Sequence, residues 1–273
     1  MSQKNTVHVV IPFYRDTTYL MKAIDSVLMQ DHQEFRLLVV DDFSPHTNVS
    51  RLVADLNDPR IEYVRNASNL GLAKNFQNCL NLVTSDWFVM LGEDDILLPN
   101  YMSEMLAVAN SQKNCAVIQP LVQIIDENGL GITPRADKVK SRLVQLMKFT
   151  NSFKGSNNTK ESVFSGSQVL PWLLLGNFFY FPTILWKTDV VKRFGFSEDY
   201  PIALDLNLLL ILTKSDRNFA FCNSVVAKYR RHEKSISNNP LNLLPRLKEE
   251  RRLSHDFLRN TQTTRTIRLL AIL

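Results

Sequence analysis

The chain has 273 residues, 45% of them hydrophobic and 22% charged, so it is long enough for a large buried core and too apolar for wholesale disorder. Its three cysteines, Cys79, Cys115 and Cys222, are widely spaced and form no CxxC pair, which argues against a disulfide framework and a zinc cluster. The formal net charge is +5, with most of the surplus beyond Arg246 and no nucleic-acid-binding motif beside it, so we expect no nucleic-acid partner.

Strands and helices alternate along the first third of the chain. Short β-branched runs predict strands, and apolar residues at helical spacing predict the helices between them. The predicted strands are 7–12, 36–42, 60–64 and 87–91, and the predicted helices are 19–30, 52–56 and 73–83. This order indicates an α/β fold with a mostly parallel sheet flanked by helices, in which ligands bind beyond the carboxyl ends of the strands.

The remaining chain is less regular. Helical spacing returns at 100–110, and apolar runs at 116–119 and 122–125 predict strand. From 132 to 167 periodicity weakens, which indicates either a long, mobile excursion over a site or a plain surface insertion. Regularity resumes in four further segments, which are 169–175, 183–186, 206–213 and 219–229.

Carboxylates gather after two of the predicted strands. Glu93-Asp94-Asp95 comes directly after the run at 87–91, and Asp41-Asp42 closes the run at 36–42. Adjacent carboxylates in a partly dry site repel, and a divalent cation removes that conflict, so the first cluster favours a Mg²⁺ or Mn²⁺ site. The alternative is an acidic turn before a helix that opens near Pro99, where the helix dipole favours negative charge.

Several segments together resemble one enzyme family. They are Val9-Val10-Ile11-Pro12-Phe13-Tyr14, Ser26-Val27-Leu28-Met29-Gln30, Val39-Val40-Asp41-Asp42-Phe43-Ser44, Asn69-Leu70-Gly71-Leu72-Ala73-Lys74-Asn75, Leu91-Gly92-Glu93-Asp94-Asp95-Ile96-Leu97-Leu98-Pro99, Ala203-Leu204-Asp205-Leu206-Asn207-Leu208 and Tyr229-Arg230-Arg231-His232-Glu233-Lys234-Ser235-Ile236-Ser237. Their order and spacing over residues 7–237 resemble the inverting, GT-A fold glycosyltransferases of family 2. That group includes bacterial polysaccharide and O-antigen sugar transferases, and the last part of the chain lies outside the likeness.

The resemblance implies a reaction. A sugar would pass, with inversion, from a nucleotide-diphosphate donor, UDP- or dTDP-linked, to a glycan or polyprenyl-linked saccharide acceptor in surface polysaccharide synthesis. The diphosphate leaves as an anion and the acceptor hydroxyl must lose a proton, so the site needs a cation and a base. Mn²⁺ or Mg²⁺ is the cofactor that the resemblance implies.

The resemblance also implies a donor site. Asp41 would hydrogen-bond the uracil edge or the ribose, and Tyr14 would form a wall for the base, unless it is an ordinary core aromatic. Lys74 would face the nucleotide, unless it is a solvated helix residue. The nucleotide-sugar-binding residues expected in this way are Pro12, Tyr14, Asp41, Asn69, Lys74, Asp94 and Arg230.

For the metal, the resemblance implies Asp95, Asp94 and His232. Asp94 would lie nearer the ribose, Asp95 would be the main metal ligand, and His232 would complete the metal or diphosphate site. One departure affects this element, because Gly92 stands where the family frequently has an aspartate. Glu93 partly restores the charge.

Asp205 is the expected general base. It precedes the almost uncharged run 206–212, where a carboxylate is costly unless it is paired or works. The alternative is that Asp205 simply caps the helix. Leu204 stands where the family usually has an acid, although one carboxylate suffices for an inverting displacement.

Two rival functions remain open. A nucleotide-sugar binding protein that has lost turnover would explain Gly92 and Leu204. A nucleotidyltransferase also uses acids around a metal, but it usually has a Gly-rich, basic phosphate loop near the first strand, and Ile11-Pro12-Phe13-Tyr14 is not one.

Two regions are expected. Residues 1–237 form the GT-A domain, with a nucleotide-binding half at 1–128 and an acceptor half at 129–237, and residues 238–273 form a basic amphipathic helical tail. The tail would either bind an anionic membrane surface or pack against the domain. Without a leader or a long apolar run, the protein is expected in the cytoplasm, with a peripheral place on the inner face of the plasma membrane if the tail binds lipid.

Overall fold

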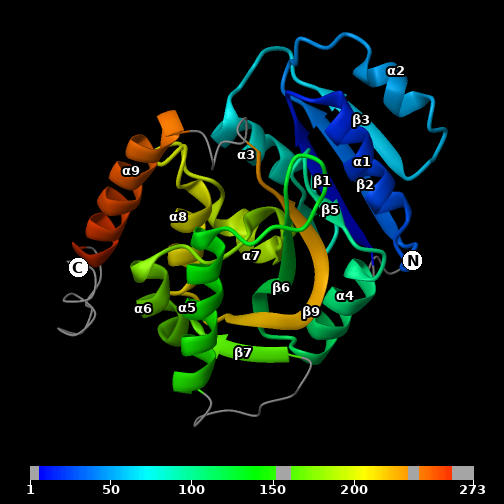
Figure 1. Cartoon of the computed structure of the whole chain (residues 1–273). Helices are drawn as coiled ribbons and strands as arrows, with labels where there is room; N and C mark the ends of the chain where they lie inside the picture. The colour runs from blue at the N-terminus through cyan, green and yellow to red at the C-terminus, as the bar shows by residue number, and fades with distance from the viewer. Residues whose placement is uncertain (1–5, 152–160, 233–239, 260–273) are drawn as a thin grey trace.

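The computed structural model describes residues 6–151, 161–232 and 240–259 (Figure 1). The strands are β1 (Val7–Phe13), β2 (Phe35–Asp41), β3 (Ile61–Arg65), β4 (Trp87–Met90), β5 (Ile96–Leu97), β6 (Cys115–Ile125), β7 (Glu161–Ser165), β8 (Leu185–Lys187) and β9 (Asn218–Arg230). The helices are α1 (Thr17–Leu28), α2 (Val49–Ala54), α3 (Leu72–Leu82), α4 (Tyr101–Ser111), α5 (Arg135–Asn151), α6 (Gly166–Leu175), the 3₁₀ helix η2 (Phe181–Thr183), α7 (Thr188–Phe194), α8 (Leu204–Leu212) and α9 (Pro240–Arg259).

The described strands form one sheet in the order β3-β2-β1-β4-β8-β6-β9-β5, with β7 paired to β9. The first four strands of this order are parallel, and β6 runs parallel to β9, whereas β8 pairs antiparallel with both of its neighbours. The predicted α/β fold is confirmed. The carboxyl ends of β1, β2 and β4 therefore meet at one edge, where the two acidic clusters lie.

Alternation along β1 explains why helices cover both faces. Val9 and Ile11 pack in the same apolar cluster as the buried face of α1, whereas Val10 packs in the cluster that contains the buried residues of α3. Successive side chains of a strand point to opposite faces, so a strand that is apolar throughout is stable only between two layers. The helices on either side fix the carboxyl end of β1.

The segment 132–167, where weak periodicity predicted no regular structure, contains a helix and a strand. The prediction is wrong over 135–151 and 161–165, which form α5 and β7. Residues 152–160 lie outside the described part. In α5, Leu143, Val144 and Met147 pack on the core, whereas Val139, Leu146 and Phe149 are exposed among charged residues. Because apolar side chains also occur on the exposed side, the helical period is weak in the sequence.

The helix α9 packs beside α8 at one side of the molecule (Figure 1). Leu253 and Phe257 are buried in the same apolar cluster as α8, whereas Leu244 and Leu247 are exposed. One side of this helix thus packs against the domain. Among the described helices, none has the length and apolar character needed to cross a bilayer. The basic residues Arg265 and Arg268 of the expected tail lie outside the described residues.

Candidate functional site

The turn after β4 links the acidic cluster to the end of β1. Glu93 Oε2 accepts hydrogen bonds from the backbone N–H groups of Tyr14 and Arg15, at 2.9 and 3.1 Å. Burial raises the pKa of Glu93, while these two hydrogen bonds lower it. Glu93 therefore holds the loop after β1 against the acidic turn, a role that the sequence pattern did not reveal.

Asp95 faces the interior. It is 2% exposed, and its Oδ1 accepts a hydrogen bond of 2.8 Å from the backbone N–H of Arg230, at the end of β9. Burial raises the pKa of Asp95 well above its ordinary value, and the nearby charge of Asp94 raises it further. This carboxylate joins β9 to the acidic turn and has little surface for a ligand.

Asp94 points toward His232. Its Oδ2 lies 2.7 Å from His232 Nε2, and its backbone carbonyl accepts a hydrogen bond of 2.8 Å from Arg230 Nε. The imidazole also contacts the ring of Tyr19, with the centroids 5.5 Å apart. A carboxylate and an imidazole 138 residues apart in the sequence are therefore brought together. Ser235 and Ser237, which belong to the same motif as His232, lie outside the described residues.

The buried Arg230 side chain holds the acidic turn in place through hydrogen bonds to backbone carbonyl groups. It is 3% exposed and donates from NH1 to the carbonyl oxygens of Asp126 and Glu127, at 2.8 and 3.1 Å. Its guanidinium lies over the ring of Tyr19, 4.7 Å from the centroid. The hydrogen bonds of Arg230 thus connect the carboxyl ends of β6 and β9 to the acidic turn.

Gly92 is required by the closeness of the acids. A Cβ at this position would lie 2.4 Å from Asp95 Oδ2 and 3.0 Å from Asp94 Oδ1. The first distance is too short for a carbon atom, and the buried Asp95 carboxylate is held by Arg230, so it cannot move away easily. The glycine at a position where relatives frequently have aspartate is therefore part of this turn.

The donor chemistry at this turn fits a divalent cation in part. Within the described ranges no group of three or more His, Cys, Asp or Glu side chains is arranged to hold a metal ion. The Asp94 and His232 side chains nevertheless offer one carboxylate and one imidazole at hydrogen-bond distance, and Mn²⁺ accepts both ligand types. A cation held by two protein groups is the arrangement in which a bound phosphate supplies further oxygens.

Asp41 is fully buried at the end of β2, and both of its carboxylate oxygens are engaged. It accepts hydrogen bonds from Ser44, from the Tyr63 hydroxyl at 2.6 Å and from Arg65 at 2.7 Å. Burial is the main cause that raises the pKa of Tyr63. The contacts of Asp41 within the chain thus fold the loop after β2, and they occupy the oxygens that the resemblance assigns to the nucleotide.

Asp42 fixes the loop that leads into α3. Its Oδ1 accepts hydrogen bonds from Asn66 Nδ2 and Leu70 N, both at 2.8 Å, and its Oδ2 accepts one from Gly71 N at 2.9 Å. Asn69 is exposed, and its side chain also accepts from Gly71 N. Gly71 has a φ of 76°, a conformation that glycine adopts readily. Asn69 therefore lies on a preformed loop at this edge of the sheet.

Two exposed aromatic rings lie beyond the ends of β1 and β2. Tyr14 is 41% exposed and Phe43 is 50% exposed, so the alternative that Tyr14 is a core aromatic is wrong. The backbone carbonyl of Phe13 accepts from Asp42 N at 2.9 Å, so the two rings start from adjacent points on the backbone. Phe43 has a φ of 57°, unusual for an aromatic residue, and its ring lies under the guanidinium of Arg65. Sequence reasoning missed Phe43, although its place directly after the paired acids was visible.

Two other expected donor residues lie around this edge. Pro12 is half-buried at the end of β1, where it pairs in register with Val40 of β2. Lys74 is exposed in the first turn of α3, and its Nζ lies 3.5 Å from Glu198 Oε2. This surface ion pair connects α3 to the loop before α8.

Asp205 lies in the first turn of α8, and the residue that caps this helix is Ala203, so the interpretation of Asp205 as the helix cap is wrong. Its Oδ2 accepts a hydrogen bond of 2.7 Å from Asn177 Nδ2, and the Asn177 Oδ1 accepts from the backbone N–H of Phe179. The Asp205 carboxylate is thus fixed in direction by an amide that is itself held by the backbone.

Lys140, on α5, donates from Nζ to the backbone carbonyl of Phe179 at 3.2 Å. Burial lowers its pKa to about 8, the charges of Arg231 and Arg246 lower it further, and those of Asp137 and Asp205 raise it. Arg231 in turn pairs with the buried Asp137, with Nε 2.7 Å from Oδ2. Charges from the Asp137–Arg231 pair and from Asp205 therefore both act on Lys140.

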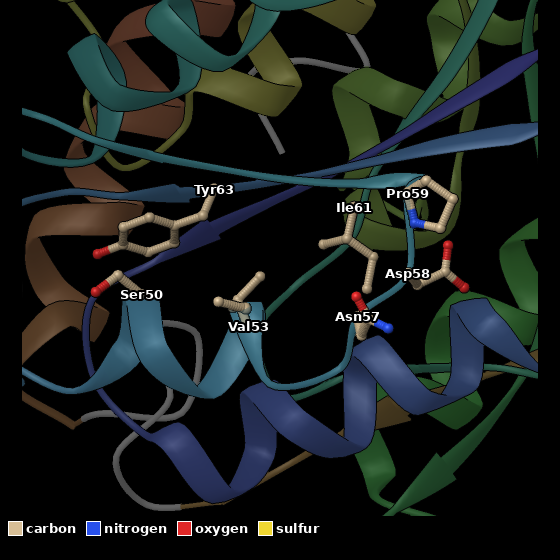
Figure 2. Close-up of a pocket in the computed structure, with 8 residues that line it drawn as sticks. Ser50, Val53, Asn57, Asp58, Pro59, Ile61 and Tyr63 are labelled. Carbon is tan, nitrogen blue, oxygen red and sulfur yellow. The ribbon is translucent and has the colours of Figure 1, made fainter.

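A surface pocket of about 380 Å³ lies between α2 and β3 (Figure 2), and its lining does not include the acids of the turn after β4. Asn57, Asp58 and Pro59 lie at one end of the pocket, and Ser50 and Tyr63 lie at the other. Asp58 is paired with Arg60 at 2.6 Å. Tyr63 lines the pocket and donates a hydrogen bond to Asp41. The pocket therefore borders the loop after β2, but Asp41 and Asp42 do not line it.

Two curated proteins with similar sequences are described as glycosyltransferases. An uncharacterized glycosyltransferase of Methanocaldococcus jannaschii is 21% identical over 94% of this chain and 79% of its own length. WcaA of Escherichia coli, a protein named for colanic acid biosynthesis, is 30% identical over 39% of each chain.

Two solved structures have the same fold. A TarS fragment from S. aureus in complex with UDP-GlcNAc superposes with a TM-score of 0.70 at 16% identity, covering 97% of this chain and 70% of that one. The mannosyltransferase PcManGT from Pyrobaculum calidifontis, in complex with GDP-Man and Mn²⁺, gives 0.66 at 13% identity, covering 97% and 68%. Residues 8–168 match the family described as "Glycosyl transferase family 2", and the chain therefore belongs to that family of glycosyltransferases.

Proposed function

We propose that this glycosyltransferase moves a sugar, with inversion, from a nucleotide-diphosphate donor to a hydroxyl of a glycan or polyprenyl-linked saccharide. The observation that carries the proposal is the contact between Asp94 and His232 at the carboxyl edge of the parallel strands, 2.7 Å apart. Ligands of open parallel sheets bind at this edge, and the pair offers two ligands for a cation that a diphosphate would complete.

In this proposal the nucleotide lies over the ends of β1 and β2. Tyr14 and Phe43 stack on or flank the base, because both rings are exposed and start from neighbouring backbone positions. Asn69 and Lys74 border the same edge, and Pro12 shapes its floor. Asp41 supports the loop and reaches the nucleotide only if Tyr63 or Arg65 gives up its hydrogen bond.

The assignment of the cation ligands is revised from the sequence-based expectation. Asp94 and His232 would hold Mn²⁺ or Mg²⁺, whereas the buried Asp95 supports them by holding the backbone of Arg230. When bound, the cation supplies charge neutralisation for the diphosphate as it leaves. Arg230, which donates to the carbonyl oxygens of Asp94, Asp126 and Glu127, keeps the two ligands in place.

Asp205 is the proposed general base. A base must accept a proton from the acceptor hydroxyl while the bond to the anomeric carbon forms. The hydrogen bond from Asn177 orients the carboxylate through Oδ2, so Oδ1 is the oxygen available for that proton. Leu204 is buried in the core, which explains how an apolar residue serves at a position where relatives usually have an acid.

The alternative function is a nucleotide-sugar binding protein without turnover. Gly92 no longer favours it, because the close approach of Asp95 requires a residue without a Cβ. Donor and acceptor identities are proposals from similarity. The TarS complexes hold UDP and UDP-GlcNAc, and the PcManGT complex holds GDP-Man, so a UDP- or dTDP-sugar is proposed first and a GDP-sugar second.

A peripheral place on the cytoplasmic face of the membrane is proposed for the exposed side of α9, and this would fit a polyprenyl-linked acceptor in polysaccharide or O-antigen synthesis. Leu244 and Leu247 are exposed beside Lys248 and Arg251, whereas Leu253 and Phe257 are buried on the opposite side. Apolar and basic side chains that share one exposed helix face are typical of binding to anionic lipid.

The proposal is tested by thermal shift of the purified protein against UDP-, dTDP- and GDP-sugars, each with and without Mn²⁺. We expect at least one nucleotide sugar to raise the melting temperature, and to raise it more with Mn²⁺ than without. A protein that responds to no nucleotide sugar in either condition would contradict the proposed donor site.

A further inference from the structure

The helix α9 holds the segment of chain that leads into α8. Its position beside α8 is visible at the side of the molecule (Figure 1). Residues 8–168 match the family, so both helices lie beyond the matched region. The contacts between α9 and the loop before α8 join charged side chains of α9 to backbone groups of the loop and to the Tyr200 side chain.

Glu249 makes the central contact. Its Oε2 accepts hydrogen bonds from the backbone N–H groups of Ile202 and Ala203, at 2.9 and 3.0 Å. Neither of these N–H groups can bond within α8, because they precede the first turn of the helix. A carboxylate on α9 thus supplies the acceptor that the start of α8 lacks, and negative charge at this end of a helix is favourable.

Further contacts hold the same loop. The Tyr200 hydroxyl donates to Asp256 Oδ2 at 2.8 Å, and the guanidinium of Arg252 lies 4.6 Å from the centre of the Tyr200 ring. Arg252 also donates to the backbone carbonyl of Asp199. Burial raises the pKa of the Tyr200 hydroxyl, and its hydrogen bond to Asp256 adds to the shift. Side chains of α9 therefore bind the loop at Asp199, at Tyr200 and at the backbone of Ile202 and Ala203.

The hydrogen bond between Glu249 and Ala203 affects the position of Asp205. The carbonyl of Ala203 accepts the first hydrogen bond of α8, from Asn207 N at 2.9 Å, while its N–H is bound to Glu249. Both peptide groups of Ala203 are fixed, and Asp205 follows two residues later. A small rotation at Ala203 would swing the Asp205 carboxylate relative to Asn177, which holds its Oδ2.

We propose that Glu249 is a positioning residue for the transfer reaction, which sets the direction of the Asp205 carboxylate by fixing the two N–H groups before α8. The inference rests on the proposed role of Asp205 as the general base. It assigns to α9 a part in catalysis that does not depend on membrane binding, because Glu249 lies on the side that faces the domain and Leu247 and Lys248 on the exposed side.

The test compares Glu249→Ala with Glu249→Gln. The alanine variant removes both hydrogen bonds, whereas glutamine keeps an acceptor oxygen on a side chain of the same length. With the nucleotide sugar that the donor panel selects, we expect Glu249→Ala to lower kcat about 10-fold with the donor KM near the wild-type value, because a general base must be placed closely. Glutamine should recover most of that loss. Hydrogen exchange at Ile202 and Ala203 should be faster in the alanine variant.

Phe257→Leu is the matched control, because it loosens the same helix at a buried position away from the loop. It should lower the melting temperature and leave kcat unchanged when assayed well below its unfolding transition. The double variant Asp205→Asn, Glu249→Ala should be no slower than Asp205→Asn alone, since the two residues act through one carboxylate.

The proposal is overturned if Glu249→Ala keeps the wild-type kcat, if glutamine is as impaired as alanine, or if Phe257→Leu loses as much kcat. Two outcomes separate a failure of the positioning role of Glu249 from a failure of the base role of Asp205. Normal turnover by Asp205→Asn would remove the base and the positioning role with it. An inactive Asp205→Asn beside a normal Glu249→Ala would remove the positioning role alone.

Discussion

Asp94 Oδ2 lies 2.7 Å from His232 Nε2, although the two residues are 138 positions apart in the sequence. The pairing depends on Asp95, which holds the backbone of Arg230 two residues before the histidine. The two adjacent carboxylates thus have different roles. Asp94 is placed to bind a ligand, and Asp95 stabilises the fold. This division leads to different expectations for substitutions at positions 94 and 95.

Asp94→Asn and His232→Gln should each remove the Mn²⁺-dependent part of the thermal shift caused by a nucleotide sugar, because each removes one of two proposed cation ligands. The measurement is the melting temperature with donor, with and without Mn²⁺. His255→Gln, at a largely exposed histidine of α9, is the matched control and should respond as the wild type does. An undiminished Mn²⁺ effect in both site variants would refute the ligand assignment.

Asp95→Ala should destabilise the fold, by about 1–3 kcal/mol, because the buried N–H of Arg230 loses its acceptor. Urea unfolding measures this change in the free energy of unfolding. Asp94→Ala serves as the comparison, since Asp94 is only partly buried, and its effect on stability should be smaller. Equal stability of the Asp95 variant and the wild type would show that the carboxylate does not carry this structural role.

Gly92→Ala should lower both stability and Mn²⁺-dependent donor binding, because a Cβ at this position overlaps the Asp95 carboxylate. The loss of stability should be about 1–3 kcal/mol, as for other overpacked sites. Gly131→Ala is a milder comparison, because the added Cβ would lie 3.0 Å from the amide of Gln123, the end of a flexible side chain. An alanine at position 92 that leaves both properties intact would contradict the account of the turn.

Asp205→Asn should reduce transfer by about 10²-fold or more, while donor affinity stays close to the wild-type value, since the base acts on the acceptor hydroxyl. Initial rates and donor binding, measured on the same preparation, separate the two effects. Glu198→Gln is the control, because Glu198 lies in the nearby loop and is paired with Lys74 on the surface. Near-normal turnover by the asparagine variant, with loss in the control, would move the role to Glu198.

Folding stability should fall between about pH 6.5 and pH 4 through His8. Burial is the main cause that lowers the pKa of His8 to about 4, so in this window the unfolded chain binds a proton that the folded chain does not. The free energy of unfolding therefore increases as pH rises from about 4 to 6.5. The increase due to His8 is at most about 3 kcal/mol. His8→Gln should flatten this dependence in urea titrations. An unchanged slope would show that another group is responsible.

The alternation of strands and helices was predictable from the sequence, because short strands buried on both faces, such as β1, leave a continuous apolar run. The helix α5 was not, since apolar residues such as Leu146 and Phe149 also occur on its exposed side and obscure the helical period. The family resemblance placed Asp94, Asp95 and His232 at one site with Asp95 as the main cation ligand, whereas we propose Asp94 and His232 for that contact. The direction of a carboxylate in a turn depends on what it packs against, and no periodic pattern records that.

The contact between Glu249 and Ala203 was also invisible in the sequence. It joins two helices through a side chain and a backbone group 46 residues apart, and Glu249 lies outside every segment that carries the family resemblance. The tail pattern left membrane binding and packing as alternatives, and the structure places Leu253 in the core while Leu247 is exposed. Long-range contacts of this kind follow from the fold and cannot be read from local spacing.

The most direct test of inverting transfer is proton NMR during hydrolysis of an α-linked donor, such as UDP-GlcNAc or the UDP-, dTDP- or GDP-sugar that the thermal-shift panel selects, with Mn²⁺. Water then takes the place of the acceptor, and the configuration of the first free sugar records the stereochemistry of the displacement. We predict release of the β-anomer by the wild-type enzyme, before mutarotation, and little release by Asp205→Asn. First appearance of the α-anomer, or no release beyond the rate without enzyme, would contradict the account.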